Sequence, residues 1–247
     1  SSDVCSSDLI EVNPRASRTV PFMSKITGIN MVEYATRIAL GESLKDTGLP
    51  LGLVPDKGYV AIKAPVFSFS KLGLVEIKLG PEMKSTGEVM CIDNQFPRAL
   101  YKACVAAGTN VPDKGTILIT VADKDKDEVT EIAEGFEDLG YTIAATEGTA
   151  NFLRSKGMTV ETAAKIGEDS PNLLDDIKEG KICMVINTMN HGESTRSDGF
   201  RIRRSTVEHA IPCLTSLDTA RALQHALGAM RRRRIVSVVA LQDLKTE

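Results

Sequence analysis

Aromatic residues are scarce in this chain of 247 residues, which has no Trp, four Tyr and seven Phe. Proteins that bind single-stranded nucleic acid use aromatic side chains as stacking platforms. The charge also argues against that class, because 30 Lys and Arg are outweighed by 33 Asp and Glu. Apolar runs are short, and none approaches the roughly 18–20 residues of a membrane-spanning helix. We therefore expect neither nucleic acid nor a membrane as a partner.

Cysteine and histidine are few and scattered. The five cysteines include no Cys-x-x-Cys pair, which is typical of a reducing compartment rather than of a disulfide framework. The three histidines have no ligand-like spacing, so we expect no zinc site. Residues 1–9 (SSDVCSSDL) lack the basic start and apolar centre of a signal peptide, and we interpret this repetitive stretch as an artefactual junction. The predicted location is cytoplasmic.

Hydrophobic residues make up 42% of the chain, which is enough to form a core and excludes global disorder. The pattern changes near residue 109. Residues 10–108 are rich in Pro and Gly, with helices expected at 31–44 and 95–107 and a strand at 59–63. Because this half offers few core-forming segments, we interpret it as the periphery of a larger fold.

Residues 109–247 alternate between short apolar strands and amphipathic helices. Strands are expected at 116–121, 141–145, 159–163, 182–188 and 211–214, and helices at 125–139, 150–156, 172–179, 203–209 and 218–230. Such alternation predicts an α/β fold with a doubly wound parallel sheet, Rossmann-like, covered by helices on both faces. Ligands of these sheets bind beyond the carboxyl ends of the strands. The residues expected there are Thr120, Thr146 to Thr149, Lys165, Asn187 and Thr188.

A first group of polar residues lies in the segment IEVNPRASR at 10–18. Glu11 and Asn13 alternate with apolar residues, so they project from one face of a predicted strand. Carboxylate and carboxamide oxygens are hard ligands suited to Mg²⁺, and the guanidinium groups of Arg15 and Arg18 suit phosphate or carboxylate. The alternative is a strand end with a solvated polar face and two surface arginines.

A second group lies in ATEGTA at 145–150, where a strand is expected to give way to a helix. Thr146 and Thr149 supply hydroxyls beside a helix N-terminus, which attracts anions. Lys165 and Asn187 add a charge and an amide at neighbouring strand ends. The alternative is that the threonines only cap the helix. Similarly, Arg203 and Arg204 are expected either to line the mouth of this site or to form a surface pair at a helix N-terminus.

Two segments together resemble a known family. EVNPRASRTVPF, followed by SKITG, and GPEMKSTGEVM at 80–90 are similar to the second ATP-grasp unit of the carbamoyl phosphate synthase large subunit. The resemblance runs from about Glu11 to the C-terminus. It implies that Glu11 and Asn13 bind the Mg²⁺ or Mn²⁺ ions that bridge ATP phosphates, and that Arg15 and Arg18 hold the phosphoryl or carbamate end of the reacting species. The family's other ATP-binding groups lie upstream of Glu11, so we expect this chain alone to be inactive.

The same resemblance divides the chain into the C-terminal part of an ATP-grasp unit at 10–108 and a methylglyoxal-synthase-like allosteric domain at 109–247. In that domain the A-T-x-G-T-A segment cradles a nucleoside monophosphate such as UMP or IMP. The implied effector contacts are Thr120, Thr146, Thr149, Lys165, Asn187 and Thr188. Met189 replaces a usual Thr and cannot donate a hydrogen bond, which puts the affinity for UMP in question. The Asp/His pairing of true methylglyoxal synthases is absent, so we expect no such activity.

Ornithine activation is expected to be weak or absent. In ornithine-activated relatives a Glu follows the Lys of a V-K-E segment, whereas this chain has Ala64 after Lys63, and Cys213 replaces an aromatic residue near that site. Both departures remove contacts to the ligand.

The function implied by the resemblance is a share in making carbamoyl phosphate from bicarbonate, ammonia taken from glutamine, and two ATP, with carbamate as an intermediate. The implied partners are a glutaminase subunit or domain and the rest of the large subunit, in arginine or pyrimidine biosynthesis. An alternative is a stand-alone nucleotide-binding regulatory module without catalysis. A third possibility, the purine cyclohydrolase with a similar C-terminal fold, is disfavoured by EVNPRASR and GPEMKSTGE.

Overall fold

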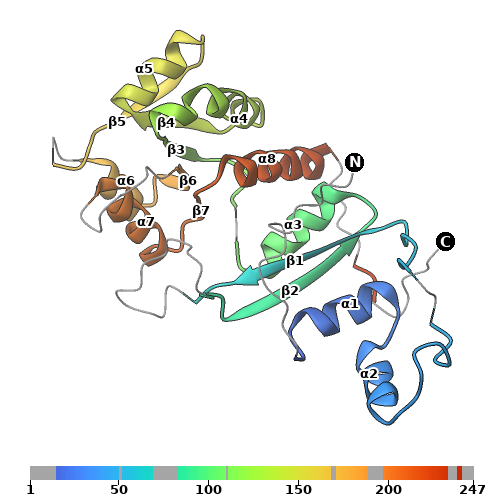
Figure 1. Ribbon diagram of the computed structural model, residues 1–247. Helices are drawn as coiled ribbons and strands as arrows, with labels where there is room; N and C mark the ends of the chain where they lie inside the picture. Colours follow the sequence, from blue (N-terminus) through green and yellow to red (C-terminus); the bar gives the residue numbers. More distant parts are fainter. Residues whose placement is uncertain are drawn as a thin grey trace.

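The computed structural model describes residues 15–49, 52–68, 83–109, 111–167, 171–188, 197–232 and 238–240. The predicted strand with Glu11 and Asn13 lies outside these residues. Figure 1 shows two parts, a small antiparallel pair of strands with three helices and a larger parallel sheet with five helices. No helix among the described residues has the length and apolar character needed to cross a membrane.

The N-terminal part forms a thin layer. It comprises α1 (Thr19–Thr27), α2 (Met31–Ala39), β1 (Val60–Val66), β2 (Gly87–Asp93) and α3 (Phe96–Ala106). β1 and β2 pair antiparallel, and α3 packs against both strands. Neither α1 nor α2 contains a buried residue. Among the described residues, these two helices therefore contribute no side chain to a core.

α1 and β2 are additional to the elements expected from the sequence pattern. Pro21 lies in the first turn of α1, where no backbone N–H is needed for an internal hydrogen bond, so it does not interrupt the helix. The helix ends at Gly28, whose φ of 73° is the left-handed conformation that glycine adopts readily. The expected helix at 31–44 is shorter than predicted and ends at Ala39.

The C-terminal part has the predicted α/β order. In chain order it contains β3 (Thr116–Thr120), η3 (Asp123–Asp125), α4 (Lys126–Asp138), β4 (Thr142–Thr146), α5 (Glu147–Ser155), β5 (Val160–Ala163), α6 (Leu173–Lys178), β6 (Ile182–Asn187), α7 (Asp198–Glu208), β7 (Cys213–Leu214) and α8 (Leu217–Arg232). The strands are all parallel, in the order β5-β4-β3-β6-β7. The doubly wound fold is therefore confirmed.

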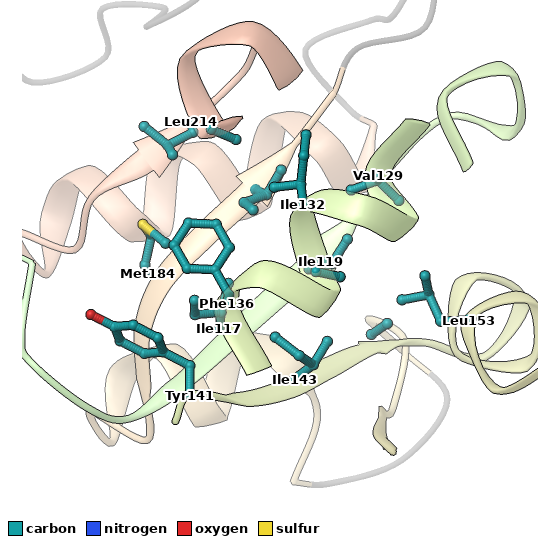
Figure 2. Packing of buried hydrophobic residues seen from close by; sticks show 14 of the residues in the cluster. Ile117, Ile119, Val129, Ile132, Phe136, Tyr141, Ile143, Leu153, Met184 and Leu214 are labelled. Carbon is teal, nitrogen blue, oxygen red and sulfur yellow. The ribbon is translucent and has the colours of Figure 1, made fainter. Parts of the chain in front are cut away.

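The core follows from the alternation of side chains along β3. Ile117 and Ile119 face α4, α5 and α8 in one apolar cluster, while Leu118 faces α6 and α7 in the other. Figure 2 shows the first cluster, in which Phe136 of α4 lies over the sheet. Its ring meets that of Tyr141 edge to face, with centroids 5.7 Å apart. Helices therefore cover both faces of the sheet, as the sequence pattern predicted.

Two helices begin earlier than expected, and both differences affect the site. α5 begins at Glu147 rather than at residue 150, so Thr149 lies inside the helix. α7 begins at Asp198 rather than at residue 203, because the Ser197 side chain caps it by accepting a hydrogen bond from the backbone N–H of Phe200 at 3.2 Å. Arg203 therefore lies in the middle of α7.

The two parts meet along α3 and α8, which lie side by side. Ala99 and Ala103 of α3 are fully buried, and such small side chains allow two helices to approach closely. Tyr101 and Cys104 of the same helix pack against the first apolar cluster of the C-terminal part. Helix α3 thus contributes to both parts.

The packing of Phe136 predicts a large effect on stability. The side chain has no exposed surface, so Phe136→Ala should lower the free energy of unfolding by about 3–5 kcal/mol through lost burial and the cavity left behind. Chemical denaturation followed by circular dichroism measures this change. Phe96→Ala is the matched control, because Phe96 is half exposed and its loss should cost about 0.5 kcal/mol or less. Equal effects of the two substitutions would contradict this description of the core.

Cys213 predicts a pH dependence at alkaline pH. Burial raises the pKa of its thiol from 9.0 to about 11. The neutral thiol is therefore favoured by folding, and its contribution to stability is complete below pH 9 and lost as the pH rises toward 11. The difference in unfolding free energy between the wild type and Cys213→Ala should be constant below pH 9 and shrink above it. A difference that stays constant up to pH 11 would contradict the burial of this thiol.

Candidate functional site

The centre of the site is the carboxyl edge of β3 and β6. In the sheet, β4 pairs with β3 on one side and β6 pairs with β3 on the other. The strand order therefore reverses between β3 and β6, and ligands of such sheets bind at this point. Thr120 and Asn187, the last residues of these strands, are paired in register. The Nδ2 group of Asn187 donates to both the carbonyl oxygen and Oγ1 of Thr120, at 3.3 Å each.

Thr188 follows directly at the same edge. Its Oγ1 accepts a hydrogen bond from the backbone N–H of Ala122 at 2.9 Å, which ties the ends of the two strands together. Thr188 also lines a cavity of about 310 Å³ whose other walls come from the segment after β3 and from the start of α8. The other lining residues are Lys124, Asp125, Glu128, Thr215, Ser216, Leu217 and Asp218. No other predicted effector residue lines this cavity.

Arg203 reaches the same edge from α7. A helix that connects two parallel strands runs antiparallel to them, so the N-terminus of α7 lies at the carboxyl edge of the sheet. Side chains on a helix lean toward its N-terminus, so the side chain of Arg203 leans toward this edge. Its Nη1 donates to Oδ1 of Asn187 at 2.6 Å, and the residue is 1% exposed. The expectation of a surface pair at a helix N-terminus is therefore wrong for Arg203. Arg204 points elsewhere and forms an ion pair with Glu208 at 2.7 Å.

Thr146 and Thr149 lie at the junction of β4 and α5. Thr146 is the N-cap residue of α5, yet its side chain makes no capping hydrogen bond. Thr149 is the third residue of the helix and is 3% exposed. The interpretation of these threonines as mere caps therefore finds no support among the described residues. Both hydroxyls accompany the first N–H groups of α5, which have no partners within the helix and favour an anion.

Lys126 is a residue of this edge that the sequence pattern does not single out. A Cβ placed on Gly148 would lie 3.7 Å from its Nζ, so the ammonium group lies beside the start of α5. The same Nζ is 2.7 Å from Oδ1 of Asp123, and this hydrogen bond lowers the pKa of the Asp123 carboxyl. Lys126 sits within the charged run DKDKDE, where no spacing distinguishes it. Its position as the first residue of α4 was the available signal.

Lys165 occupies a more peripheral position. It is an exposed residue two positions beyond the end of β5. β5 is the outermost strand next to β4, and its last residue, Ala163, pairs with Thr146. Lys165 therefore follows the same edge on the Thr146 side, while Thr120, Asn187 and Thr188 mark its middle.

The first predicted group lies in the N-terminal part. Arg15 is exposed, and its Nη1 donates to the carbonyl oxygen of Ala16 at 3.3 Å. Arg18 precedes α1 and lines a second cavity of about 230 Å³, together with Pro21, Phe22, Lys25, Lys63, Glu88, Val89 and Met90. Nζ of Lys63 lies 3.3 Å from Oε2 of Glu88, which also lines this cavity, and 3.3 Å from Oγ1 of Thr19 in α1. Among the described residues, no His, Cys, Asp and Glu gather in a group of three that suits a metal ion.

Comparison with known families matches two ranges of the chain. Residues 5–47 match the family described as "Carbamoyl-phosphate synthase L chain, ATP binding domain", and residues 128–215 match the "MGS-like domain". Among solved structures, the chain is similar to methylglyoxal synthase from Elizabethkingia anophelis NUHP1, with 22% identity, a TM-score of 0.38, and coverage of 46% of this chain and 79% of that one. It is also similar to ForH, with 22% identity, a TM-score of 0.31, and coverage of 47% and 91%.

The parallel sheet, its helices and the family match define the C-terminal part as an MGS-like domain. It follows a fragment of a carbamoyl phosphate synthase large-chain ATP-binding domain, which is the domain order at the C-terminus of carbamoyl phosphate synthase large subunits.

Proposed function

We propose that the carboxyl edge of the sheet binds a nucleoside monophosphate of the UMP or IMP type as a regulatory ligand. The observation that carries this proposal is the start of α5, where Thr146 makes no capping hydrogen bond and Thr149 is nearly buried at the third helical position. Hydroxyls and helix N–H groups left in this state are the donors that a phosphate needs. The ammonium group of Lys126 beside Gly148 supplies positive charge.

The remaining groups suit the rest of a nucleotide. Thr120, Asn187 and Thr188 line up across the middle of the edge, where hydroxyl and amide groups recognise ribose and base atoms by hydrogen bonds. Lys165 adds a second cation on the phosphate side of the edge. Phosphate is thereby bound near β4 and α5, with the nucleoside extending toward β3 and β6.

The second part of the proposal is that the chain serves a carbamoyl phosphate synthase, which makes carbamoyl phosphate from bicarbonate, ammonia derived from glutamine, and two ATP. Arg15 and Arg18 would orient the phosphoryl or carbamate group and stabilise the charge that grows on it during transfer. Glu11 and Asn13 would hold Mg²⁺ or Mn²⁺, since carboxylate and carboxamide oxygens are hard donors. The metal supplies charge neutralisation for the ATP phosphates.

Regulation follows from the contact between the two parts. A nucleotide that binds one of two states more tightly shifts the population toward that state, and the coupling to substrate binding is reciprocal. Helix α8 begins at the cavity that Thr188 lines, and along its length it packs against α3. The proposed partners are the rest of the large subunit and a glutaminase subunit or domain in the cytoplasm, and the proposed pathways are arginine and pyrimidine biosynthesis.

The second candidate is a regulatory module without catalysis. It is favoured by the confinement of the proposed nucleotide site to the C-terminal part, because every described residue of that site lies between positions 120 and 188. Measuring synthase activity after adding the full chain to a large-subunit preparation that lacks its C-terminal part separates the two. Restored, nucleotide-sensitive carbamoyl phosphate synthesis supports the first candidate, and binding without restored synthesis supports the second.

The two ends of β4 provide a test of the nucleotide site. Thr146→Val removes a hydroxyl at the carboxyl edge, whereas Thr142→Val removes one at the opposite edge of the same strand. In calorimetric titrations of the full chain with UMP and IMP, Thr146→Val should raise the Kd of the bound nucleotide by about tenfold, as expected for one lost hydrogen bond of about 1.4 kcal/mol. Thr142→Val should leave Kd unchanged. Equal Kd values for Thr146→Val and Thr142→Val would contradict the site. Ornithine should bind neither variant.

Lys126 offers an independent test through charge. Lys126→Met keeps the aliphatic stem but removes the ammonium group, and hydrogen bonds to charged groups contribute about 1.5–3 kcal/mol. Kd for the nucleotide should therefore rise by about 10- to 100-fold, with a weaker salt dependence than in the wild type. Lys178→Met is the control, because Lys178 is exposed at the end of α6, away from this edge. A larger rise in Kd for Lys178→Met than for Lys126→Met would place the bound phosphate elsewhere.

A further inference from the structure

We propose that Arg203 is a positioning residue of the nucleotide site, which acts by fixing the side chain of Asn187 and, through it, the hydroxyl of Thr120. This inference rests on the proposed function, since it assigns a role within the same site. The three side chains form a continuous hydrogen-bonded row from α7 across β6 to β3.

The guanidinium group determines which way the Asn187 carboxamide faces. Arginine has only donors, so the atom of Asn187 that meets Nη1 of Arg203 at 2.6 Å must be the oxygen. The Nδ2 group is then left to face β3, where it donates to Thr120. A reversed carboxamide would place two donors against each other in a buried position, because Asn187 is 2% exposed.

The orientation of Asn187 in turn determines what Thr120 presents. The Oγ1 atom of Thr120 accepts from Nδ2 of Asn187, so its own proton points away from Asn187. Thr120 is partly exposed at the end of β3, so its hydroxyl faces the carboxyl edge as a donor. It therefore selects a ligand with an oxygen acceptor at this point, such as a base carbonyl or a ribose oxygen of a nucleotide.

Burial makes the row rigid. Arg203 is 1% exposed and Asn187 is 2% exposed, and a charge-assisted hydrogen bond is stronger where water is excluded. The sequence alone indicated a surface or mouth position for Arg203. Its role as a support beneath the edge depends on the early start of α7 at Asp198, which places Arg203 one and a half turns into the helix.

The test compares Arg203→Met with Arg204→Met in the full chain. Arg204 is the adjacent arginine, and it pairs with Glu208 rather than with the edge. Calorimetric titration with UMP and IMP should show Kd raised about tenfold by Arg203→Met, the loss expected for one ligand hydrogen bond, and unchanged by Arg204→Met. Arg203→Lys, which keeps a charged donor, should recover part of the loss. Equal Kd values for Arg203→Met and the wild type would overturn the proposal.

A double-mutant cycle separates positioning from a general structural role. If Arg203 acts through Thr120, then Arg203→Met should change Kd little in a Thr120→Val background, although the two residues are not hydrogen-bonded to each other. Additive losses would overturn the proposal. Asn187→Asp is the variant to use if Arg203→Met fails to fold, because a carboxylate keeps its partner on Arg203 but cannot donate to Thr120. It keeps the ion pair with Arg203 but loses the hydrogen bonds to Thr120, so the chain should stay folded with a lower Tm. It should lose the same affinity as Thr120→Val, and a wild-type Kd would count against the role.

A ligand-free measurement distinguishes this proposal from the proposed function. The side-chain amide protons of Asn187 should exchange slowly with solvent in nuclear magnetic resonance spectra of the wild type and fast in Arg203→Met. If the wild type binds neither UMP nor IMP but this exchange difference is present, the nucleotide proposal fails and the positioning of Asn187 stands. Slow exchange in both proteins would overturn the positioning role, whatever the protein binds.

Discussion

The pairing of β3 with β6 is the constraint on which the rest of the C-terminal part depends. Because both strands are parallel and in register at their ends, Thr120 and Asn187 are brought side by side although 67 positions separate them. The backbone N–H of Ala122 and the hydroxyl of Thr188 join the same two strands one step further on. Strand ends that are held in this way give a fixed row of polar groups, and a fixed row binds a ligand with little cost of ordering.

The electrostatics of this edge combine groups of different origin. Positive charge comes from Lys126, Lys165 and the buried Arg203, and further partial charge comes from the first N–H groups of α5. The cavity beside Thr188, by contrast, has the carboxylates of Asp125, Glu128 and Asp218 on its walls. Lys126 and Lys165 thus place positive charge near β4 and α5, Arg203 places it beneath the end of β6, and carboxylates predominate near the start of α8.

Much of the fold could be predicted from the sequence, because buried parallel strands such as 116–120 are short apolar runs and the intervening helices have one apolar face. The predicted effector residues also lie at or beside the expected edge, because the carboxyl ends of parallel strands all lie at the same edge of the sheet. Lys126 was missed, and Arg203 was assigned only to a mouth or surface position, for physical reasons. Their roles depend on where α7 and α4 begin, and the capping residue that starts α7, Ser197, lies in a polar segment without periodicity. β2 was missed because it pairs with β1 across a long connection, and the alternation of strands and helices that marks a parallel sheet is absent from this antiparallel pair.

The packing of α3 has a consequence for the modularity of this protein. Tyr101 and Cys104 belong to the N-terminal part by sequence, yet they cover apolar residues of the C-terminal cluster, and Ala99 and Ala103 of the same helix are also buried. A truncation placed after α3 would remove the helix that packs against α8 and expose apolar side chains to water, which promotes self-association. A truncation ahead of Phe96 would keep α3 but expose the side of the helix that packs against β1 and β2, so neither cut leaves a self-contained domain.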